Sequence, residues 1–190
     1  PAAKTDSLVS YSMGEFSHYR MRVSNAEFFV LDTRSHRQLH DTRDPFKEGV
    51  SMLGTAQKRW LKEGMRASGA DFFFVVSSVN LMIPHVHPKQ PDKDEAWTAI
   101  AGEREELIEF WDSLGKPVFV LTGDLHNSMA IRVTPRVWEF ASGPHNSGNH
   151  PAWAESDRPA NGSFASRGRE CEIRWSTHFE NDSSPRRQPV

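Results

Sequence analysis

The sequence has little of what would mark several large classes of protein. It contains a single cysteine, Cys171, among 190 residues, so no disulfide bond can form within the chain. No apolar run approaches the roughly 20 residues that a membrane-spanning helix requires, and no signal peptide is recognisable. The net charge of −2 provides no basic excess of the kind that binds nucleic acid. These absences predict a globular protein without evident affinity for membranes or nucleic acids, and they leave its compartment open.

Aromatic residues and histidines are, by contrast, plentiful. Twelve phenylalanines and six tryptophans are enough for a hydrophobic core, and a chain of this length usually forms one domain. We expect that domain over residues 1–180, followed by a disordered tail at 181–190, where polar and charged residues dominate. The nine histidines suggest metal or phosphate chemistry.

The hydrophobic pattern predicts strands that alternate with amphipathic helices. Three continuous apolar runs suit strands buried on both faces, which is typical of parallel sheets. We therefore expect an α/β fold, a parallel or mixed sheet with flanking helices and an antiparallel extension. Of the remaining long segments, 84–94 is loop-like and 143–170 is predicted to be mostly loop. The expected elements are a hairpin at 19–34, a helix at 53–68, a strand at 71–79, a helix at 103–115, a strand at 117–124, a hairpin at 130–142 and a final antiparallel strand at 171–179.

The stretch "LTGDLHNS" (121–128) places an acid and an imidazole directly after one of the apolar strands. In α/β sheets, ligands collect at the carboxyl ends of the strands. Asp124 and His126, one residue apart, could both bind one cation there, and a bound metal lowers the pKa of water toward about 7. The alternative is that Asp124 caps the amides of its own loop and His126 is an ordinary surface residue.

Several segments occur in a characteristic order within about residues 19–142: "LDTRSHR", "LGTAQKRWLKEGMRASGADFFFVVSSV", "EREELIEFWDSLGKPVFVLTGDLHNSMAI" and "VWEFASG". This order resembles the alkaline phosphatase D-like branch of the calcineurin-type metallophosphoesterases. The resemblance implies a sheet sandwich flanked by helices, a metal centre, and hydrolysis of phosphate mono- or diesters by metal-bound hydroxide. It implies iron with calcium as the metals, whereas oxygen and nitrogen ligands also suit zinc or manganese. An exported location is compatible with it.

The resemblance also carries roles to individual residues. Asp124 and His126 become candidate metal ligands, and His126 is also a candidate proton donor to the leaving oxygen. Arg34 can bind phosphate with its planar guanidinium, although a salt bridge that holds the strand end is an equal alternative. Independently of the resemblance, Asn127 and His145 are candidate substrate-binding residues because amide and imidazole groups can donate to phosphate oxygens, although the loop that carries His145 could equally be an ordinary turn-rich loop.

The early metal motifs of the metallophosphoesterases, a strand ending in Asp-x-His followed by Gly-Asp-x-x-Asp, do not occur in residues 1–52. The chain therefore resembles the carboxy-terminal half of such an enzyme. We expect the amino-terminal half, as a separate or cleaved chain, to be its partner. Three central strands, ending near Asp32, Ser77 and Asp124, are expected to leave one apolar sheet edge unpaired. A non-catalytic binding or regulatory protein that retains the fold is the second interpretation.

Overall fold

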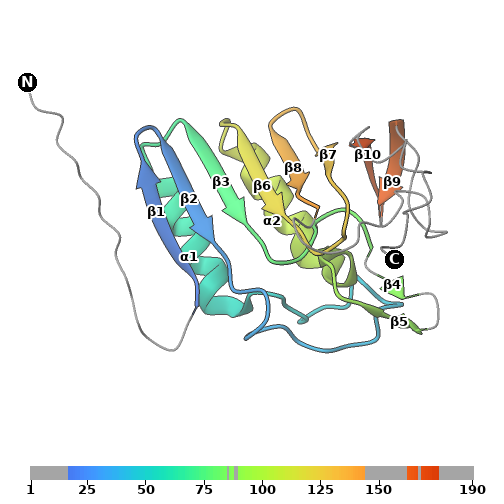
Figure 1. Ribbon diagram of the computed structural model, residues 1–190. Coiled ribbons are helices and arrows are strands. Elements are labelled where there is room, and N and C mark those ends of the chain that lie inside the picture. Colours follow the sequence, from blue (N-terminus) through green and yellow to red (C-terminus); the bar gives the residue numbers. More distant parts are fainter. Residues whose placement is uncertain (1–16, 85, 88–89, 144–161, 167, 176–190) are drawn as a thin grey trace, which may run out of the picture.

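A computed structural model describes residues 17–84, 86–87, 90–143, 162–166 and 168–175. Its main feature is one large mixed sheet with two helices packed on one face (Figure 1). No helix in this part of the chain is long and apolar enough to cross a membrane. The elements are β1 (Tyr19–Val23), β2 (Ala26–Val30), α1 (Gly54–Ala67), β3 (Phe72–Val76), β4 (Val86–His87), β5 (Gln90–Asp94), a 3-10 helix η1 (Trp97–Ile100), α2 (Ala101–Ser113), β6 (Val118–Thr122), β7 (Met129–Arg132), β8 (Val137–Ala141), β9 (Gly162–Ser166) and β10 (Arg169–Trp175).

The large sheet has the strand order β1-β2-β3-β6-β8-β7-β10-β9. Strands β2, β3, β6 and β8 are parallel, and the strands outside this group pair antiparallel. The predicted α/β class with a parallel centre and an antiparallel extension is therefore confirmed. Both predicted hairpins are also present, β1 with β2 and β7 with β8.

The segment 84–94, predicted as a loop, contains two strands, and there the expectation is wrong; the segment 143–170, predicted as mostly loop, includes one complete strand among its described residues, while 144–161 lie outside the described part of the chain. Strands β4 and β5 form a small antiparallel sheet within the first segment, and β9 lies in the second. Strand β10 begins at Arg169, two residues earlier than predicted. These strands pair through backbone hydrogen bonds, which any residue except proline can donate. Because these segments are polar or contain glycine, the hydrophobic pattern of the sequence does not reveal them. The predicted tail at 181–190 lies outside the described residues.

One face of the sheet is covered by α1 and α2. The Phe29 ring contacts Trp60 of α1 at 5.6 Å between centroids, and Leu61 and Met65 of the same helix are buried. Of the buried residues on α2, Leu107 and Trp111 join the same hydrophobic core. These contacts bury the alternate residues of the parallel strands that face the helices, among them Phe73, Val75, Val118, Val120 and Val137.

Gly64 lets α1 approach this face closely. A Cβ atom at Gly64 would lie 2.9 Å from Phe29 Cε1 and 3.0 Å from Arg20 Nη1, whereas one at Gly102 in α2 would come no closer than 3.9 Å to another part of the chain. We expect Gly64→Ala to lower the free energy of unfolding by about 1–3 kcal/mol through overpacking. The matched change Gly102→Ala should raise it by up to about 1 kcal/mol, because alanine favours helix over glycine. Urea unfolding of both variants tests this, and equal effects would contradict it.

The opposite face of the sheet is apolar and incompletely covered. Two rows of side chains run in register across β2, β3, β6 and β8. Neighbouring rings touch, with centroids 4.5 Å apart for Phe28 and Phe74 and 5.3 Å for Phe74 and Phe119. The residues of this face are half-buried, except that Phe140 is 40% exposed. We call this surface the aromatic face; it consists of Phe28, Phe74, Phe119 and Trp138 in one row and Val30, Val76, Leu121 and Phe140 in the other.

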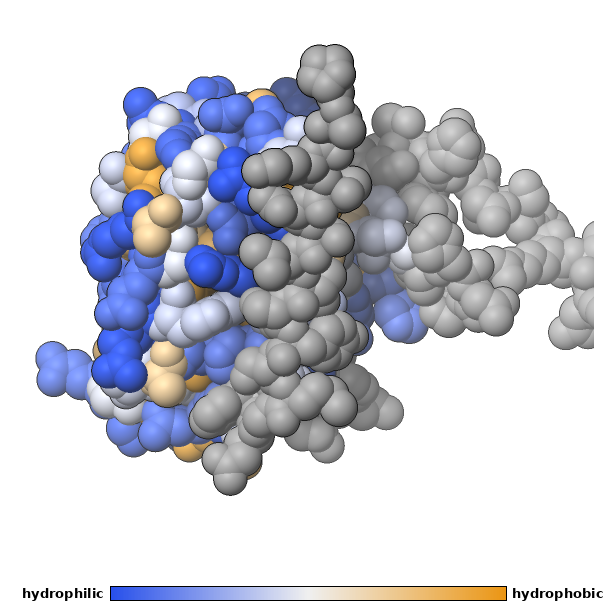
Figure 2. All heavy atoms as spheres, turned by 90° about the vertical axis from the view of Figure 1, so that its left-hand side faces the viewer, coloured by the Kyte–Doolittle hydropathy of each residue, from blue (hydrophilic) through white to orange (hydrophobic). Residues whose placement is uncertain are grey.

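The expected unpaired apolar edge is not found. Strand β2 is paired with β1 and strand β6 with β8, so the three strands named in the prediction have partners on both sides. The edge at β1 exposes Arg20 and Arg22, and Figure 2, which looks onto this side, shows a mostly hydrophilic surface. Apolar side chains on the described residues thus form a continuous, half-buried surface on a face of the sheet, whereas the β1 edge mixes the exposed apolar Tyr19 and Val23 with exposed arginines.

Candidate functional site

The carboxyl ends of β2, β3 and β6 meet at one end of the sheet because these strands are parallel. Asp32, Ser77 and Asp124 follow the three strands there, as the sequence predicted. This is the place where ligands bind in α/β sheets of this kind. The candidate site is built on the loops that continue from these strand ends.

Asp124 and His126 lie on a turn with an unusual backbone. Both have positive φ, 73° and 58° respectively, a conformation that only a few per cent of non-glycine residues adopt. Leu125 between them is buried, and the Asn127 side chain, which is also buried, donates a hydrogen bond from Nδ2 to the Leu125 carbonyl at 3.0 Å. Such backbone strain persists only where the surroundings hold it, and it is concentrated at functional sites. The Asp124 side chain is 40% exposed, so its carboxylate is accessible to a ligand.

The structure brings Arg34 to this turn. Its Nη2 atom lies 4.0 Å from Asp124 Oδ2, and its Nη1 atom donates to Glu95 Oε2 at 3.4 Å. The guanidinium is 54% exposed, and both contacts are long for ion pairs. The salt bridge and the accessible guanidinium are thus both present at Arg34. His145, the remaining predicted site residue, lies outside the described residues.

Asp32 fixes the loop that carries Arg34. Its Oδ1 atom accepts hydrogen bonds from the backbone nitrogens of Arg34 at 3.0 Å and Ser35 at 2.9 Å. The Gln57 side chain, buried on α1, binds the backbone nitrogen of Asp32 at 2.8 Å and its carbonyl at 2.9 Å. Burial alone would raise the pKa of Asp32, but hydrogen bonds from Ser35 and Arg34 outweigh it and lower the pKa to about 2.

Because the pKa of Asp32 in the folded protein lies below its ordinary value of 3.8, its ionised form stabilises the fold above that value. This contribution is lost as the pH falls through about 2. We expect Asp32→Asn to lower the free energy of unfolding by about 1–2 kcal/mol at neutral pH, because a charged acceptor is lost. The difference from the parent protein should shrink as the pH falls from about 4 toward 2. Denaturant unfolding over that range measures it; a difference that does not change with pH would contradict the assignment.

Glu139 is a buried residue that supports the strand ends of the site, and its sequence context alone did not identify it as a site residue. Its side chain is fully buried and accepts hydrogen bonds from the backbone nitrogens of Leu81 and Met82 at 2.7 and 2.9 Å and from Thr122 Oγ1 at 2.8 Å. Burial raises the pKa of Glu139 even though these donors favour the charged form. Glu139 thereby joins the loop after β3 to the end of β6. Its position between Val137 and Ala141, in the buried phase of β8, was the available signal.

The described residues do not form a complete metal centre. No group of three or more histidine, cysteine, aspartate or glutamate side chains within them could hold a metal ion. Asp124 and His126 have the chemistry of two ligands, whereas closed metal sites generally use four or more.

The fold is thus that of an α/β protein. At the strand ends, a turn with positive φ at Asp124 and His126 lies beside the Arg34 guanidinium, and these groups could bind a cation and an anion. The family model described as PhoD-like phosphatase matches residues 16–181. The chain belongs to the PhoD-like phosphatase family, which confirms the resemblance seen in its sequence.

A solved structure described as "Structure of PhoD" has the same fold. It is 25% identical to this chain with a TM-score of 0.55, and the match covers 66% of this chain but 28% of that one. The chain thus corresponds to less than a third of the length of that protein. No curated protein sequence matches significantly.

Proposed function

We propose that the chain is one part of a metal-dependent phosphoesterase and supplies the Arg34–Asp124–His126 corner of its active site. The observation that carries the proposal is the 4.0 Å approach of Arg34 to Asp124 on a strained turn at the carboxyl end of the sheet. Both residues lie within the part of the chain that matches the phosphatase family. The substrate is a phosphate mono- or diester.

Each residue has a role that suits its environment. Asp124 and His126 hold metal, and when bound the metal supplies activated water and neutralises phosphate charge. Iron with calcium is the proposed pair, with zinc or manganese as alternatives. Arg34 leaves its long contacts to bind phosphate oxygens with its planar fork. His126 also donates a proton to the leaving oxygen. Asn127 and His145 contact the substrate.

A second polypeptide segment completes the site by packing on the aromatic face. Sheets with a parallel centre are normally covered on both faces, yet here the helices cover one. An open aromatic surface of this kind marks an interaction site. We assign it to the amino-terminal half of the metallophosphatase, as a separate or cleaved chain or as a segment linked to this one. The match covers 28% of the PhoD structure, so 72% of that protein has no counterpart in the matched part of this chain. This unmatched part supports the proposal of such a partner.

This partner would contribute the missing ligands together with the second layer of the sandwich. The interface should be large, above about 2,000 Å², and mostly apolar, as in obligate complexes. A non-catalytic protein that retains the fold is the second candidate, favoured by the absence of a complete ligand group among the described residues.

The proposal is tested by purifying the chain together with the polypeptide encoded next to it. The assembly is assayed on a chromogenic phosphodiester and a chromogenic phosphomonoester, with its metal content measured in parallel. We expect tightly bound metal, hydrolysis of at least one ester, and loss of turnover on chelation. Metal-free material that remains inactive after addition of each candidate metal would favour the non-catalytic alternative.

A further inference from the structure

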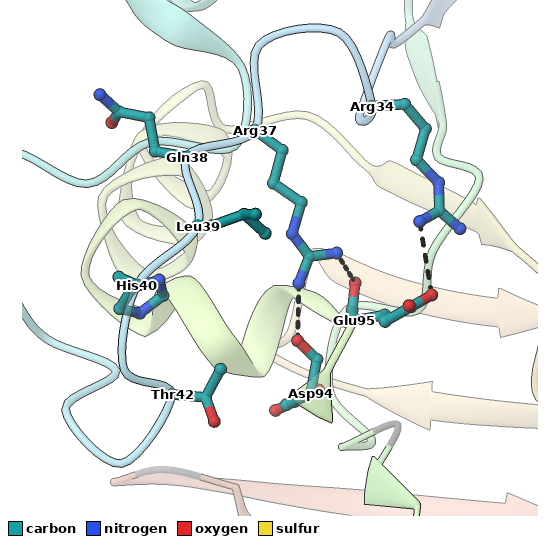
Figure 3. A pocket seen from close by; sticks show the side chains of 8 residues that line it. All are labelled: Arg34, Arg37, Gln38, Leu39, His40, Thr42, Asp94 and Glu95. Atoms are coloured by element: carbon teal, nitrogen blue, oxygen red, sulfur yellow. Dashed lines mark hydrogen bonds and ion pairs between the residues drawn. The ribbon is translucent and has the colours of Figure 1, made fainter. Parts of the chain in front are cut away.

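A pocket of about 350 Å³ opens beside the candidate site, between the loop at 34–42 and the segment before η1 (Figure 3). Arg34 belongs to both places, since it lines the pocket and lies 4.0 Å from Asp124. A volume of this size holds a small organic group and not only a phosphate. The residues that line it are Arg34, Arg37, Gln38, Leu39, His40, Thr42, Asp94 and Glu95.

The charges that line the pocket balance. Arg34 and Arg37 carry positive charge, and Asp94 and Glu95 carry negative charge. The half-buried Arg37 guanidinium is committed to the wall, because it donates to the backbone carbonyls of Glu95 and Asp94 at 2.6 Å each. The buried Asp94 carboxylate is committed as well, to the Ala96 nitrogen at 3.0 Å and the Thr98 hydroxyl at 2.5 Å. With its charges balanced, the lining offers no net attraction to a charged group on the alcohol portion of a ligand.

The remaining groups suit a ligand with hydroxyls and an apolar side. His40 Nε2 is buried and has no hydrogen-bond partner among the described residues. Glu95 is partly exposed, and its carboxylate can accept further hydrogen bonds. Leu39 is 92% exposed and offers an apolar surface. Sugar rings combine hydroxyl groups with C–H surfaces and fit this set of contacts.

We infer that this pocket binds the alcohol portion of the phosphate ester, and that this portion is a neutral, hydroxyl-bearing group about the size of a hexose. The inference rests on the proposed phosphoesterase function, since it places the phosphate at Arg34 and the alcohol deeper, against Arg37 and His40. It predicts weaker binding of alcohols that carry a carboxylate, because the lining holds Asp94 and Glu95 and has no excess of positive charge to pair with that group.

The test uses the chain alone, because it contains every residue that lines the pocket. Side-chain NMR signals of Arg34, Arg37 and His40 are followed during titration with a hexose 6-phosphate, with inorganic phosphate and with 6-phosphogluconate. We expect the hexose phosphate to shift all three signals, inorganic phosphate to shift Arg34 alone, and the carboxylated sugar to bind at least about tenfold more weakly. Unchanged Arg37 and His40 signals, or equal binding of the two sugars, would overturn the inference.

A variant of Leu39, an exposed residue that lines the pocket, provides a second test of ligand binding there. Leu39→Trp should not affect folding, because Leu39 is almost fully exposed, yet its indole would obstruct the pocket. We expect it to weaken hexose phosphate binding about tenfold and, in the complete assembly, to lower kcat/KM for the hexose ester relative to methyl phosphate by a similar factor. Arg43→Gln, whose arginine pairs with Asp41 outside the pocket, is the control and should change neither. Pocket binding without hydrolysis of any ester would refute the proposed function alone; hydrolysis with unchanged ratios in Leu39→Trp would refute the pocket alone.

Discussion

Asp124→Asn should reduce the phosphoesterase activity of the complete assembly by at least about 100-fold, because an amide is a poor substitute for a carboxylate ligand. The same change should alter the free energy of unfolding by no more than about 0.5 kcal/mol. Asp124 is partly exposed, and its contact with Arg34 is 4.0 Å long, so the lost ion pair contributes little to stability. Asparagine also tolerates the positive φ of 73° as well as aspartate does, so the turn is not disturbed.

Asp71→Asn is the matched control for this variant. Asp71 is also an exposed aspartate beside a strand of the parallel group, but it lies at the amino end of β3, where it accepts a hydrogen bond from Asn25. Activity, metal content and thermal unfolding are measured on both variants. Full activity in Asp124→Asn would remove this residue from the site, and an equal loss in both variants would show that the effect is not specific to the turn.

Phe119→Asp should weaken association with the proposed amino-terminal half by about 3–5 kcal/mol, which is about two to four orders of magnitude in Kd. Phe119 is in the middle of the aromatic face, with Phe74 at 5.3 Å and Phe140 at 6.1 Å between ring centroids. A carboxylate there would be buried without a partner once a second layer covers the face. In the isolated chain the same residue is only half-buried, so the stability of that chain should fall less.

Phe46→Asp is the control, because Phe46 is 50% exposed and its backbone lies close to Gly102 of α2, the helix that covers the opposite face. Sedimentation velocity of the mixed chains and fluorescence of a hydrophobic dye report association and exposure of the aromatic face. We expect the parent chain alone to bind the dye and to lose it on addition of its partner. Equal association of both variants would mean that the second segment docks elsewhere.

The parallel centre of the sheet could be predicted because its strands are continuous apolar runs. Residues 71–79 and 117–124 each combine such a run with a helix-like segment nearby, and this alternation is typical of parallel sheets. The antiparallel strands β4, β5 and β9 could not be predicted in the same way. Their segments are polar or rich in glycine and serine, and their pairing depends on backbone groups that leave no trace in the hydrophobic pattern.

The candidate site was only partly predictable. The rule that ligands bind at the carboxyl ends of parallel strands pointed to Asp124 and His126, and the resemblance pointed to Arg34; the structure places Arg34 Nη2 4.0 Å from Asp124 Oδ2. Other parts of the site depend on contacts between segments that are 58 residues apart. Glu139 accepts a hydrogen bond from Leu81, and Arg37 donates one to the Glu95 carbonyl in the pocket wall. A single sequence does not reveal such pairings, because each of these side chains is of a type usually found at the surface. The expectation of an unpaired apolar edge was wrong for a different reason: the predicted hairpin at 19–34 already supplies β1, which pairs with the outer side of β2.

The aromatic face is a candidate binding surface for the proposed second polypeptide. The missing early motifs suggested a partner from the sequence, but they did not say where it would bind. Two apolar rows in register across four parallel strands would offer the proposed partner a docking surface. A layer packed there would extend to the same strand ends at which Arg34 and Asp124 lie, and its loops could bring the missing ligands.

The central claim is that this chain holds one corner of a phosphoesterase site and needs a second segment to complete it. The most direct measurement compares turnover of a chromogenic phosphodiester by the chain alone with turnover by the same chain after addition of its amino-terminal partner, with metals present in both. The account predicts no turnover above background for the chain alone and metal-dependent turnover for the assembly. Full turnover by the isolated chain would contradict it and would place the whole site within these 190 residues.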